Sequence, residues 1–403
     1  MGYLQQQKEV TPAAPAANYT QVFPDSAEGN RLKQIDETGL VNTLTNNGLR
    51  ATNMLINGGF NINQRLAAAL SNIPSPSLTA RVMTGDRWGF TIGNVTTPQF
   101  QQVDARTATE AGLLAEYYAR YKQLTNAAKM LVTQVVSADN TSRLRGKTVR
   151  LSAKMRYSVG SNRNIRMSVH YLTSAGAIDT MPASYVPAFN GASTDPTWGT
   201  NITALAPVLV DNCTISGLGA TCGITAAWQR FSATFAVPSN CLNVIVAIWN
   251  DTIGAASDDL LLTEVGLYLG QEIIDWTPLT LELELIRCQR YYQKTFPQGV
   301  APAQNAGLAG AAKGLVTLIA AAALASNIFL RFKQTMFKTP TITLFNPSVA
   351  NAAMRRYTAT ATDQTATATA NVTTDDLEVT ATGDAAGIVG DKVAIHIAVD
   401  AEI

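Results

Sequence analysis

Apolar and polar residues alternate with a period of two in several short stretches of the central part of the chain. In residues 149–157 one face carries Val149, Leu151, Ala153, Met155 and Tyr157, and the other carries Arg150, Ser152, Lys154 and Arg156. The same period recurs at residues 167–171 and 231–237, and residues 242–249 place apolar residues on both faces. Successive side chains of a β-strand point to opposite faces. Because Gly, Pro and Asn turns separate these stretches, the pattern predicts an all-β fold built on a jelly-roll-like antiparallel β-sandwich.

A second β domain is predicted after Pro297. Residues 299–310 are typical of a loop, and strands return at residues 341–345 and 393–399. Residues 357–374 alternate Thr and Ala, which favours a strand but provides little apolar bulk for a core. Such a strand is better stabilised at a subunit interface. We therefore expect residues 297–403 to form a β domain that takes part in self-association.

One apolar stretch approaches the length of a membrane span. Residues 314–330 are rich in Ala and Leu, but Thr317, Ser326 and Asn327 interrupt them and no aromatic belt flanks them. We expect this stretch to be buried within the protein, without membrane insertion.

Residues 277–292 begin like a helix, with a Thr cap at Thr277 and Pro in the first turn. Leu281, Leu285, Cys288 and Tyr292 follow at heptad-like spacing. This stripe either forms a seam between subunits or packs on its own sandwich, and the sequence leaves both alternatives open.

The charge composition argues against nucleic-acid binding. The chain of 403 residues has 30 Lys and Arg against 29 Asp and Glu, and 15% of its residues are charged. A nucleic-acid-binding domain usually has a basic field, which is missing here, so DNA and RNA are not expected partners. The charged fraction is well below the ~25% of an average soluble domain, which suits large contacts with neighbouring subunits.

Six segments together resemble the carbohydrate-binding-module-like β-sandwich of tailed-bacteriophage tail fibres and related virion appendages. They are residues 53–65, containing Asn-Gly-Gly-Phe-Asn-Ile-Asn-Gln-Arg, then Gly-Asp-Arg-Trp at 85–88, Leu-Arg-Gly-Lys-Thr-Val-Arg-Leu-Ser at 144–152, Trp-Gln-Arg-Phe at 228–231, Glu-Val-Gly-Leu-Tyr-Leu-Gly at 264–270, and Arg-Cys-Gln-Arg-Tyr-Tyr-Gln-Lys at 287–294. Each segment alone is only a strand end or a turn, so the resemblance rests on the series. It spans roughly residues 53–296, and we assign residues 51–296 to the sandwich.

The resemblance implies a structural bacteriophage protein, most simply a tail fibre or tail appendage subunit located in the virion and made in the host cytoplasm. Residues 1–50 resemble, more weakly, the segments that attach such proteins to the particle, and their Pro/Ala stretch at 11–17 suits a tether. No secretion signal is found at the start. We expect a homo-oligomer, a trimer, with other virion proteins and a host surface glycan as partners. A head fibre or capsid decoration protein is the first alternative, and a glycan depolymerase the second.

Sugar binding needs aromatic faces with amides and carboxylates nearby. Tyr185 and Trp198, in the long connection at residues 173–227, and Trp249 on a strand are the candidates, with packing or subunit contact as the alternative role. For Trp88 and Trp228 we expect a core role, because both belong to the segments that define the resemblance.

The chain has few residues that could support catalysis or bind a metal. His170 and His396 are the only histidines, each in an alternating stretch, so neither a Ser-His-Asp triad nor a multi-His metal site is expected. We expect both to be bonded locally or to face solvent. No cofactor or metal is predicted, and we expect no enzymatic activity.

Paired carboxylates are the remaining route to glycoside cleavage. Asp251, Asp258, Asp259 and Glu264 lie close in sequence, and we interpret them as residues of a solvated turn. For the depolymerase alternative, Asp258, Asp259 and Glu264 are the acids to test first.

The four cysteines lack a C-x-x-C arrangement, which argues against a zinc site. Cys213 and Cys222 flank a short Gly-containing loop and form a disulfide if the protein meets oxidising conditions. A reduced pair fits assembly in the cytosol equally well.

Overall fold

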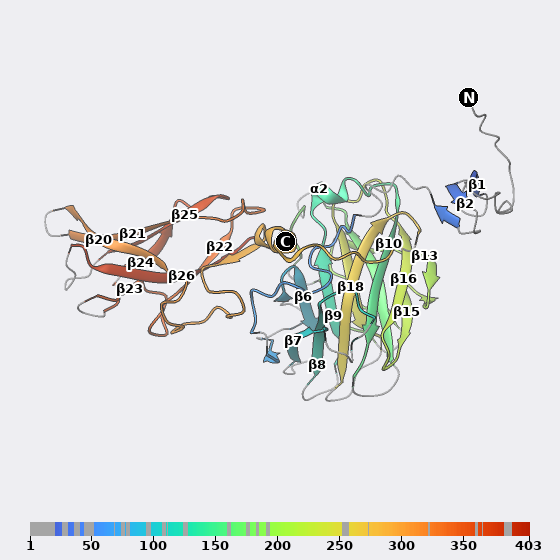
Figure 1. Cartoon of the computed structure of the whole chain (residues 1–403), viewed down its shortest axis with the longest axis horizontal. Helices are drawn as coiled ribbons and strands as arrows, with labels where there is room; N and C mark the ends of the chain where they lie inside the picture. Colours follow the sequence, from blue (N-terminus) through green and yellow to red (C-terminus); the bar gives the residue numbers. More distant parts are fainter. Residues whose placement is uncertain are drawn as a thin grey trace, which may run out of the picture. The chain divides into compact units, whose positions relative to one another are not determined.

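The computed structural model forms two compact units, residues Met1–Thr52 and Asn53–Ile403. Figure 1 shows the chain coloured along its sequence. Of the first fifty residues the structure describes 21–25, 31–35 and 41–43. From residue 52 it describes all except 68, 74–76, 78–80, 94–97, 107–109, 111, 124–127, 159–162, 175–177, 183–184, 191–193, 252–257, 273, 321–322, 359–361, 365 and 383–388.

The first unit contains a small antiparallel sheet of β1 (Gln21–Asp25), β2 (Arg31–Ile35) and β3 (Val41–Thr43). The predicted tether at residues 11–17 lies outside the described residues. Attachment through residues 1–50 stays a prediction.

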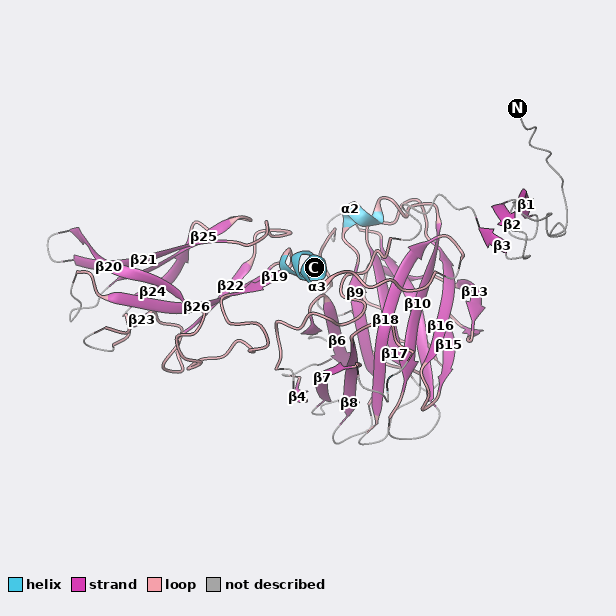
Figure 2. Cartoon of the chain, in the orientation of Figure 1, coloured by secondary structure: helices cyan, strands magenta, loops and turns pink. Residues whose placement is uncertain are grey.

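The second unit begins with two sheets that pack as a sandwich (Figure 2). Sheet I contains, in spatial order, β13 (Pro207–Asp211), β16 (Gln229–Ala236), β10 (Thr148–Arg156), β18 (Asp259–Leu269), β8 (Tyr117–Gln123), β7 (Pro98–Asp104) and β4 (Ser71–Asn72). Sheet II contains β14 (Thr214–Ser216), β15 (Gly219–Ile224), β11 (Arg163–Leu172), β17 (Val244–Asn250), β9 (Met130–Val135), β6 (Trp88–Ile92) and β5 (Val82–Gly85), with β12 (Ile202–Ala204) paired to β11. The long connection at residues 173–227 thus contains four of these strands, β12 to β15.

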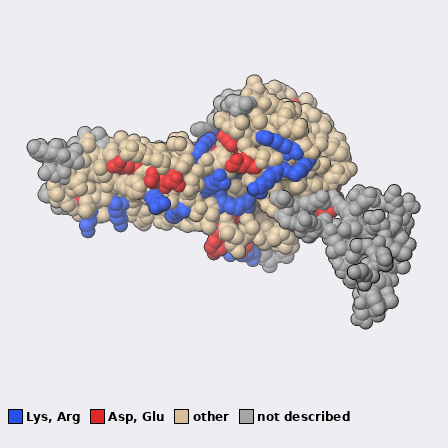
Figure 3. All heavy atoms as spheres, turned by 90° about the horizontal axis from the view of Figure 1, so that it is seen from above, with Lys and Arg blue, Asp and Glu red and all other residues tan. Residues whose placement is uncertain are grey.

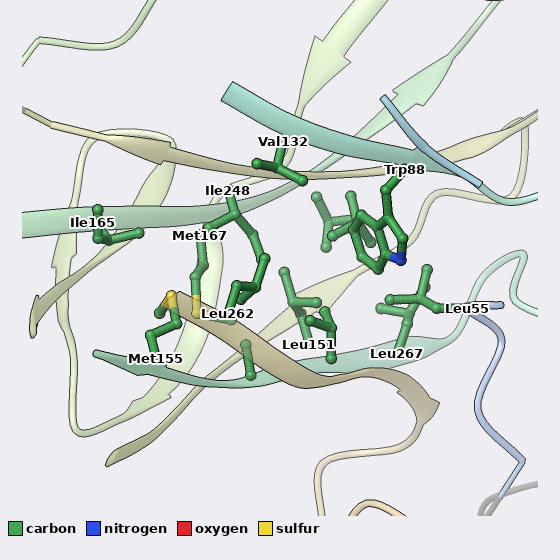
Figure 4. Packing of buried hydrophobic residues seen from close by; sticks show 14 of the residues in the cluster. Leu55, Trp88, Val132, Leu151, Met155, Ile165, Met167, Ile248, Leu262 and Leu267 are labelled. Atoms are coloured by element: carbon green, nitrogen blue, oxygen red, sulfur yellow. The ribbon is translucent and has the colours of Figure 1, made fainter. Parts of the chain in front are cut away.

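The core between the sheets follows the predicted alternation. Leu151 and Met155 of β10 face Val246 and Ile248 of β17 across one apolar cluster, which also contains Trp88. Figure 4 shows Trp88, Leu151, Met155 and Leu262 directed into this space. On the other face of β10 the expected solvent exposure is only partly correct. Arg150 and Ser152 are buried, and Lys154 and Arg156 are partly exposed.

The outer face of sheet II is covered by the chain itself. Ile245, Ala247 and Trp249 of β17 lie there in a second apolar cluster, with Tyr185, Val186, Cys288 and Ile403 among its other members. This explains why residues 242–249 are apolar on both faces. A strand buried on both sides needs apolar side chains on both.

The chain forms two short helices, α2 (Ala138–Thr141) and α3 (Leu281–Gln289), among the described residues. The predicted cap of α3 was wrong by three residues, because Thr280 rather than Thr277 accepts the capping hydrogen bond from Leu283 N. Of the predicted stripe, Leu285 and Cys288 pack on the sandwich, whereas Leu281 is exposed. Tyr292 lies beyond the helix in a strand. The stripe therefore packs mainly on its own sandwich.

The C-terminal sheet contains β19 (Tyr292–Lys294), β26 (Lys392–Asp400), β20 (Ala312–Ala320), β21 (Ala323–Arg331), β25 (Asp376–Thr382) and β24 (Ala366–Ala370), in that order, with β22 (Thr341–Phe345) and β23 (Arg355–Arg356) also paired to β26. β19 lies before the predicted boundary at residues 296–297 and nevertheless pairs with β26. Part of the Thr/Ala segment forms the edge strand β24.

Residues 314–330 form most of the β20–β21 hairpin. Their predicted burial is correct for only one face: Val316 and Ile328 are buried, whereas Leu315 and Phe329 are exposed. No helix in the described part of the chain is long and apolar enough to span a membrane. The predicted all-β class is confirmed, since the sheets in the described part of the chain are antiparallel and the two helices described there are short.

Candidate functional site

The three aromatic residues predicted to bind sugar come together on the outer face of sheet II. The ring centroids of Trp198 and Trp249 lie 5.4 Å apart, and those of Tyr185 and Trp198 lie 5.5 Å apart. Tyr185 is 2% exposed and Trp249 is fully buried. In this arrangement the two rings pack against their neighbours and have no face for a sugar, so a stacking role for them would require the loop that carries Tyr185 and Trp198 to open.

His170 lies within this aromatic cluster and is buried rather than solvent-facing. Its Nε2 lies 2.7 Å from Ser168 Oγ, and its Nδ1 is hydrogen-bonded to the Tyr185 hydroxyl. Burial lowers the pKa of His170 to about 3. A neutral histidine with both ring nitrogens hydrogen-bonded is a structural residue. This agrees with the expected local bonding and not with the alternative of solvent exposure.

His396 is also buried. Its Nδ1 lies 3.2 Å from Thr295 Oγ1 and its Nε2 lies 2.8 Å from the Gly307 carbonyl oxygen. Its ring stacks on Phe296.

The carboxylates interpreted as a solvated turn are buried, so that interpretation was wrong. Asp251 pairs with Arg166 at 2.9 Å, and Asp259 pairs with Arg120 at 2.9 Å. Asp258 and Glu264 are also less than one-tenth exposed. Asp259 and Glu264 belong to β18 itself, where burial requires that each carboxylate has a partner.

A polar groove lies on the outer face of sheet I, away from the predicted aromatic residues. It has a volume of about 390 Å³ and is lined by Leu114, Ser152, Lys154, Asp211, Asn212, Arg230, Glu264, Asp275 and Trp276. These residues come from β10, β16, β18, the end of β13 and three loops. Figure 3 shows that basic side chains gather in a band on the visible face of the molecule, with acidic side chains among them.

The groove presents hydrogen-bond donors and acceptors of several kinds. Asp275 pairs with Arg230, and the Asp275 side chain is 83% exposed. Asn212, at φ 56°, donates from Nδ2 to the Arg230 carbonyl oxygen at 2.8 Å. Asp211 lies 3.9 Å from Arg150. A guanidinium, an amide and two carboxylates thus surround one hollow.

A β-bulge places Glu264 in this groove. The pairing of β10 with β18 shifts register between Ser152 and Lys154, opposite Glu264. Glu264 has φ 50°, a left-handed conformation that a side-chain-bearing residue adopts at a cost. Its carboxylate accepts hydrogen bonds from the backbone N–H groups of Leu114 and Ala115 and pairs with Lys154 at 2.9 Å. Bulges commonly redirect a side chain next to a functional site.

The Gly-Gly pair of the first resemblance segment supports this bulge. A Cβ on Gly58 would lie 2.0 Å from the Val265 carbonyl oxygen, and a Cβ on Gly59 would lie 2.8 Å from the Trp276 ring. Asn53 donates from Nδ2 to the same Val265 oxygen at 3.0 Å. Only residues without a Cβ allow this close approach, so the segment packs directly behind the groove.

A second aromatic position lies on the same face, next to the groove. Trp228 and Tyr118 meet edge to face at 5.4 Å, and the Arg156 guanidinium lies 5.1 Å from the Trp228 ring. Trp228 donates from Nε1 to Glu110. The predicted core role is correct for Trp88, whereas Trp228 is half-buried in a small cluster outside the main core.

Three resemblance segments meet where the sandwich contacts the C-terminal sheet. Arg65 pairs with Asp400 at 2.7 Å and lies over the Tyr292 ring at 3.8 Å. Arg87 pairs with Glu402 and lies over the Tyr291 ring at 3.5 Å. These segments therefore hold the last residues of the chain.

The structure joins Cys213 and Cys222 in a disulfide with their Cα atoms 4.4 Å apart. Cys213 lies between β13 of sheet I and β14 of sheet II, so the bond fixes the strand crossing at one edge of the sandwich. Cys241 and Cys288 are free and buried. Burial raises the pKa of Cys241 to about 12, which makes this thiol unreactive. The described residues contain no group of three potential metal ligands from His, Cys, Asp and Glu.

Of the groove residues, only Glu264 was named as a candidate from the sequence, as an acid of the depolymerase alternative. Trp276 follows Asp275 after the last strand of the sandwich, in a stretch without alternation. The available signal was the charged face of β10, which alternates Arg150, Ser152, Lys154 and Arg156.

Comparison with protein-family models and with curated proteins gives no match. Several solved structures are similar to the chain. TmCBM61 in complex with β-1,4-galactotriose is 14% identical, with 55% of this chain and 99% of that chain covered and a TM-score of 0.29. The CBM22-1–GH10 modules of Clostridium thermocellum endo-1,4-β-D-xylanase 10B are 12% identical, with coverages of 51% and 29% and a TM-score of 0.28. The enzymatically active domain of Bacteriophage CBA120 tailspike protein 4 is 10% identical, with coverages of 54% and 21% and a TM-score of 0.30. At this level of similarity, these structures assign no functional role to any residue of this chain.

Proposed function

We propose that the groove on the outer face of sheet I binds a glycan without cleaving it. The observation that carries this proposal is the hollow of about 390 Å³ in which an exposed carboxylate, a partly exposed guanidinium, an amide and a mostly buried indole converge. Polar groups directed into a partly apolar hollow are the usual basis of small-ligand recognition.

The groove matches the chemistry of a sugar. A pyranose ring has apolar C–H faces and a rim of hydroxyl groups that both donate and accept hydrogen bonds. Asp275 accepts hydrogen bonds, Arg230 donates them, and the Asn212 amide does both. Trp276 and Leu114 supply apolar wall. Charge-assisted hydrogen bonds to exposed hydroxyls provide affinity at modest cost, because Asp275 is already exposed to water.

The arrangement of the acids favours binding over cleavage. A glycoside hydrolase needs one carboxylic acid that donates a proton to the leaving oxygen. In the groove Glu264 lies against Lys154, Asp275 against Arg230 and Asp211 against Arg150. Each carboxylate thus serves as the partner of a cation, which suits a fixed acceptor rather than a proton donor.

We further propose that the chain is a structural subunit of a bacteriophage tail fibre or tail appendage, located in the virion and attached through residues 1–50. The series of six sequence segments supports this proposal. Deletion of residues 1–50 should leave a soluble sandwich that no longer enters virions. Normal incorporation of the shortened chain would contradict the attachment role.

The binding proposal is tested with the full chain and a panel of bacterial surface polysaccharides in affinity electrophoresis. Asp275→Ala and Arg230→Ala should each lower retention by roughly fivefold or more, as expected for the loss of one charge-assisted hydrogen bond. Arg106→Ala is the matched control, because Arg106 also pairs with a carboxylate, Asp104, at an exposed position outside the groove.

Cleavage is followed in the same samples by reducing-end assay. No reducing ends should appear on prolonged incubation. Their accumulation would favour the depolymerase alternative. Glu264 and Asp275, which line the groove, would then be replaced before Asp258 and Asp259, which are buried outside it.

A further inference from the structure

The C-terminal sheet has one exposed face with large apolar side chains. β20, β21 and β25 direct Val316, Ile328 and Leu377 into an apolar cluster on one side. On the opposite side Phe329 is 68% exposed and Leu315 is 52% exposed. A phenylalanine this exposed on an inner strand of a sheet leaves apolar surface in contact with water. Contact with another molecule would bury that surface, which is favourable.

Opposite charges lie on the two sides of Phe329. Leu315 pairs in register with Asn327, and the same register two residues further places Lys313 beside Phe329. On the other side Phe329 pairs with Glu378. Lys313, Phe329 and Glu378 therefore form one row across β20, β21 and β25.

The two charged groups of this row have no ionic partner among the described residues. Lys313 is exposed and makes no ion pair there. The Glu378 carboxylate accepts one hydrogen bond, from Asn371 Nδ2 at 2.9 Å. Both groups remain available for an ion pair with another molecule.

The row is complementary to itself. A two-fold axis that lies in the contact plane, parallel to the strands and close to Phe329, places Lys313 of each copy opposite Glu378 of the other. This contact alone joins two chains, and the trimer expected from the resemblance stays a separate prediction. Symmetric assemblies use surfaces that match in this way, and opposite charges fix their register. The edge strand β24 is the neighbour of β25, which carries Glu378. β24 has no charged residue to discourage contact with another chain.

We propose that the face formed by Lys313, Leu315, Phe329 and Glu378, the Phe329 face, is where copies of this chain associate. The partner is a further copy of the same chain. Phe329 supplies the apolar centre, and the Lys313 and Glu378 side chains pair across the contact. This assignment is independent of the glycan-binding groove.

The test is a charge exchange in the full chain, with the assembly mass measured by sedimentation equilibrium over a range of concentrations. Lys313→Glu and Glu378→Lys should each weaken association by roughly tenfold or more, because each places like charges in contact. The double variant should recover most of the wild-type association, since it restores opposite charges in exchanged positions.

Phe329→Ser should weaken association more than either charge reversal. Leu283→Ser is the matched control, because Leu283 is similarly exposed, at 52%, but lies on α3. A monomer mass for the native chain at all concentrations would overturn the proposal. Unchanged masses of the three single variants of the Phe329 face would also overturn it, as would a double variant that does not recover association.

Discussion

Lys154 Nζ lies 2.9 Å from Glu264 Oε2, and this ion pair joins β10 to the bulge of β18. The carboxylate is almost fully buried, whereas the Lys154 side chain is 21% exposed at the groove. Glu264 also accepts hydrogen bonds from two backbone N–H groups. The bulge, the ion pair and the loop at Leu114 therefore form one supporting layer beneath the proposed binding surface.

Replacement of Glu264 should show the backbone strain at the bulge. At φ 50° a glycine is unstrained, whereas alanine keeps the strain and loses the carboxylate contacts. We expect Glu264→Ala to be less stable than Glu264→Gly by about 1 kcal/mol in urea unfolding, the reverse of the usual order in a strand. A more stable alanine variant would show that Glu264 does not adopt this conformation.

The stability of the protein should depend on pH through His170. The folded-state pKa of about 3 lies below the ordinary value of 6.5, so the unfolded chain binds the proton first as pH falls. This contribution to stability is complete above about pH 6.5 and is lost between pH 6.5 and 3, at up to about 1.4 kcal/mol per unit. From pH 7.5 to 5, wild type should therefore lose about 2 kcal/mol more than His170→Gln, whose side chain does not titrate.

The comparison with His170→Gln is needed because another buried group acts with the opposite sign. Burial raises the pKa of Asp86 to about 6, so the folded chain binds that proton more readily and is favoured as pH falls. Asp86 is unchanged in both proteins, and its effect cancels in the difference. Equal pH slopes for wild type and His170→Gln would contradict the burial of His170.

Side-chain alternation predicted the strands of the sandwich but not their neighbours in space. The faces of Leu151 and Arg150 could be assigned from sequence, because the period of two depends only on local geometry. The groove could not be predicted from the sequence, because β10, β16 and β18 become adjacent through long-range pairing. The sequence shows that residues 242–249 are apolar on both faces, but it does not show that a distant loop covers Trp249.

The junction between the sandwich and the C-terminal sheet should depend on Arg87. This buried side chain pairs with Glu402 and donates to the Val135 carbonyl oxygen at 2.7 Å. Arg87→Met leaves both acceptors without this partner and should cost about 3 kcal/mol of stability. Hydrogen exchange of β26 should become faster than in wild type.

Arg290→Met is the control for this variant. Arg290 also lies over an aromatic ring, that of Phe337, but is exposed. We expect a change within about 0.5 kcal/mol and unchanged exchange in β26. Equal effects of the two variants would show that the Arg87 contacts do not hold the end of the chain.

The disulfide should stabilise the edge of the sandwich under oxidising conditions. Cys213 and Cys222 are nine residues apart, and closing a loop of this length contributes roughly 2–3 kcal/mol in the chain-entropy description. Cys213→Ser should therefore unfold at lower urea concentration than wild type, and the difference should disappear in reductant. Thiol titration of the unfolded, unreduced chain should find two reactive cysteines rather than four.

The most direct measurement of the central claim compares glycan affinity for wild type, Asp275→Ala and Trp198→Ala by isothermal titration, with folding of each protein checked by circular dichroism. If the glycan binds in the groove on sheet I, Asp275→Ala should weaken binding roughly fivefold or more, and folded Trp198→Ala should bind like wild type. Loss of binding in folded Trp198→Ala, with wild-type affinity in Asp275→Ala, would contradict the groove and would place the glycan at the aromatic cluster on sheet II.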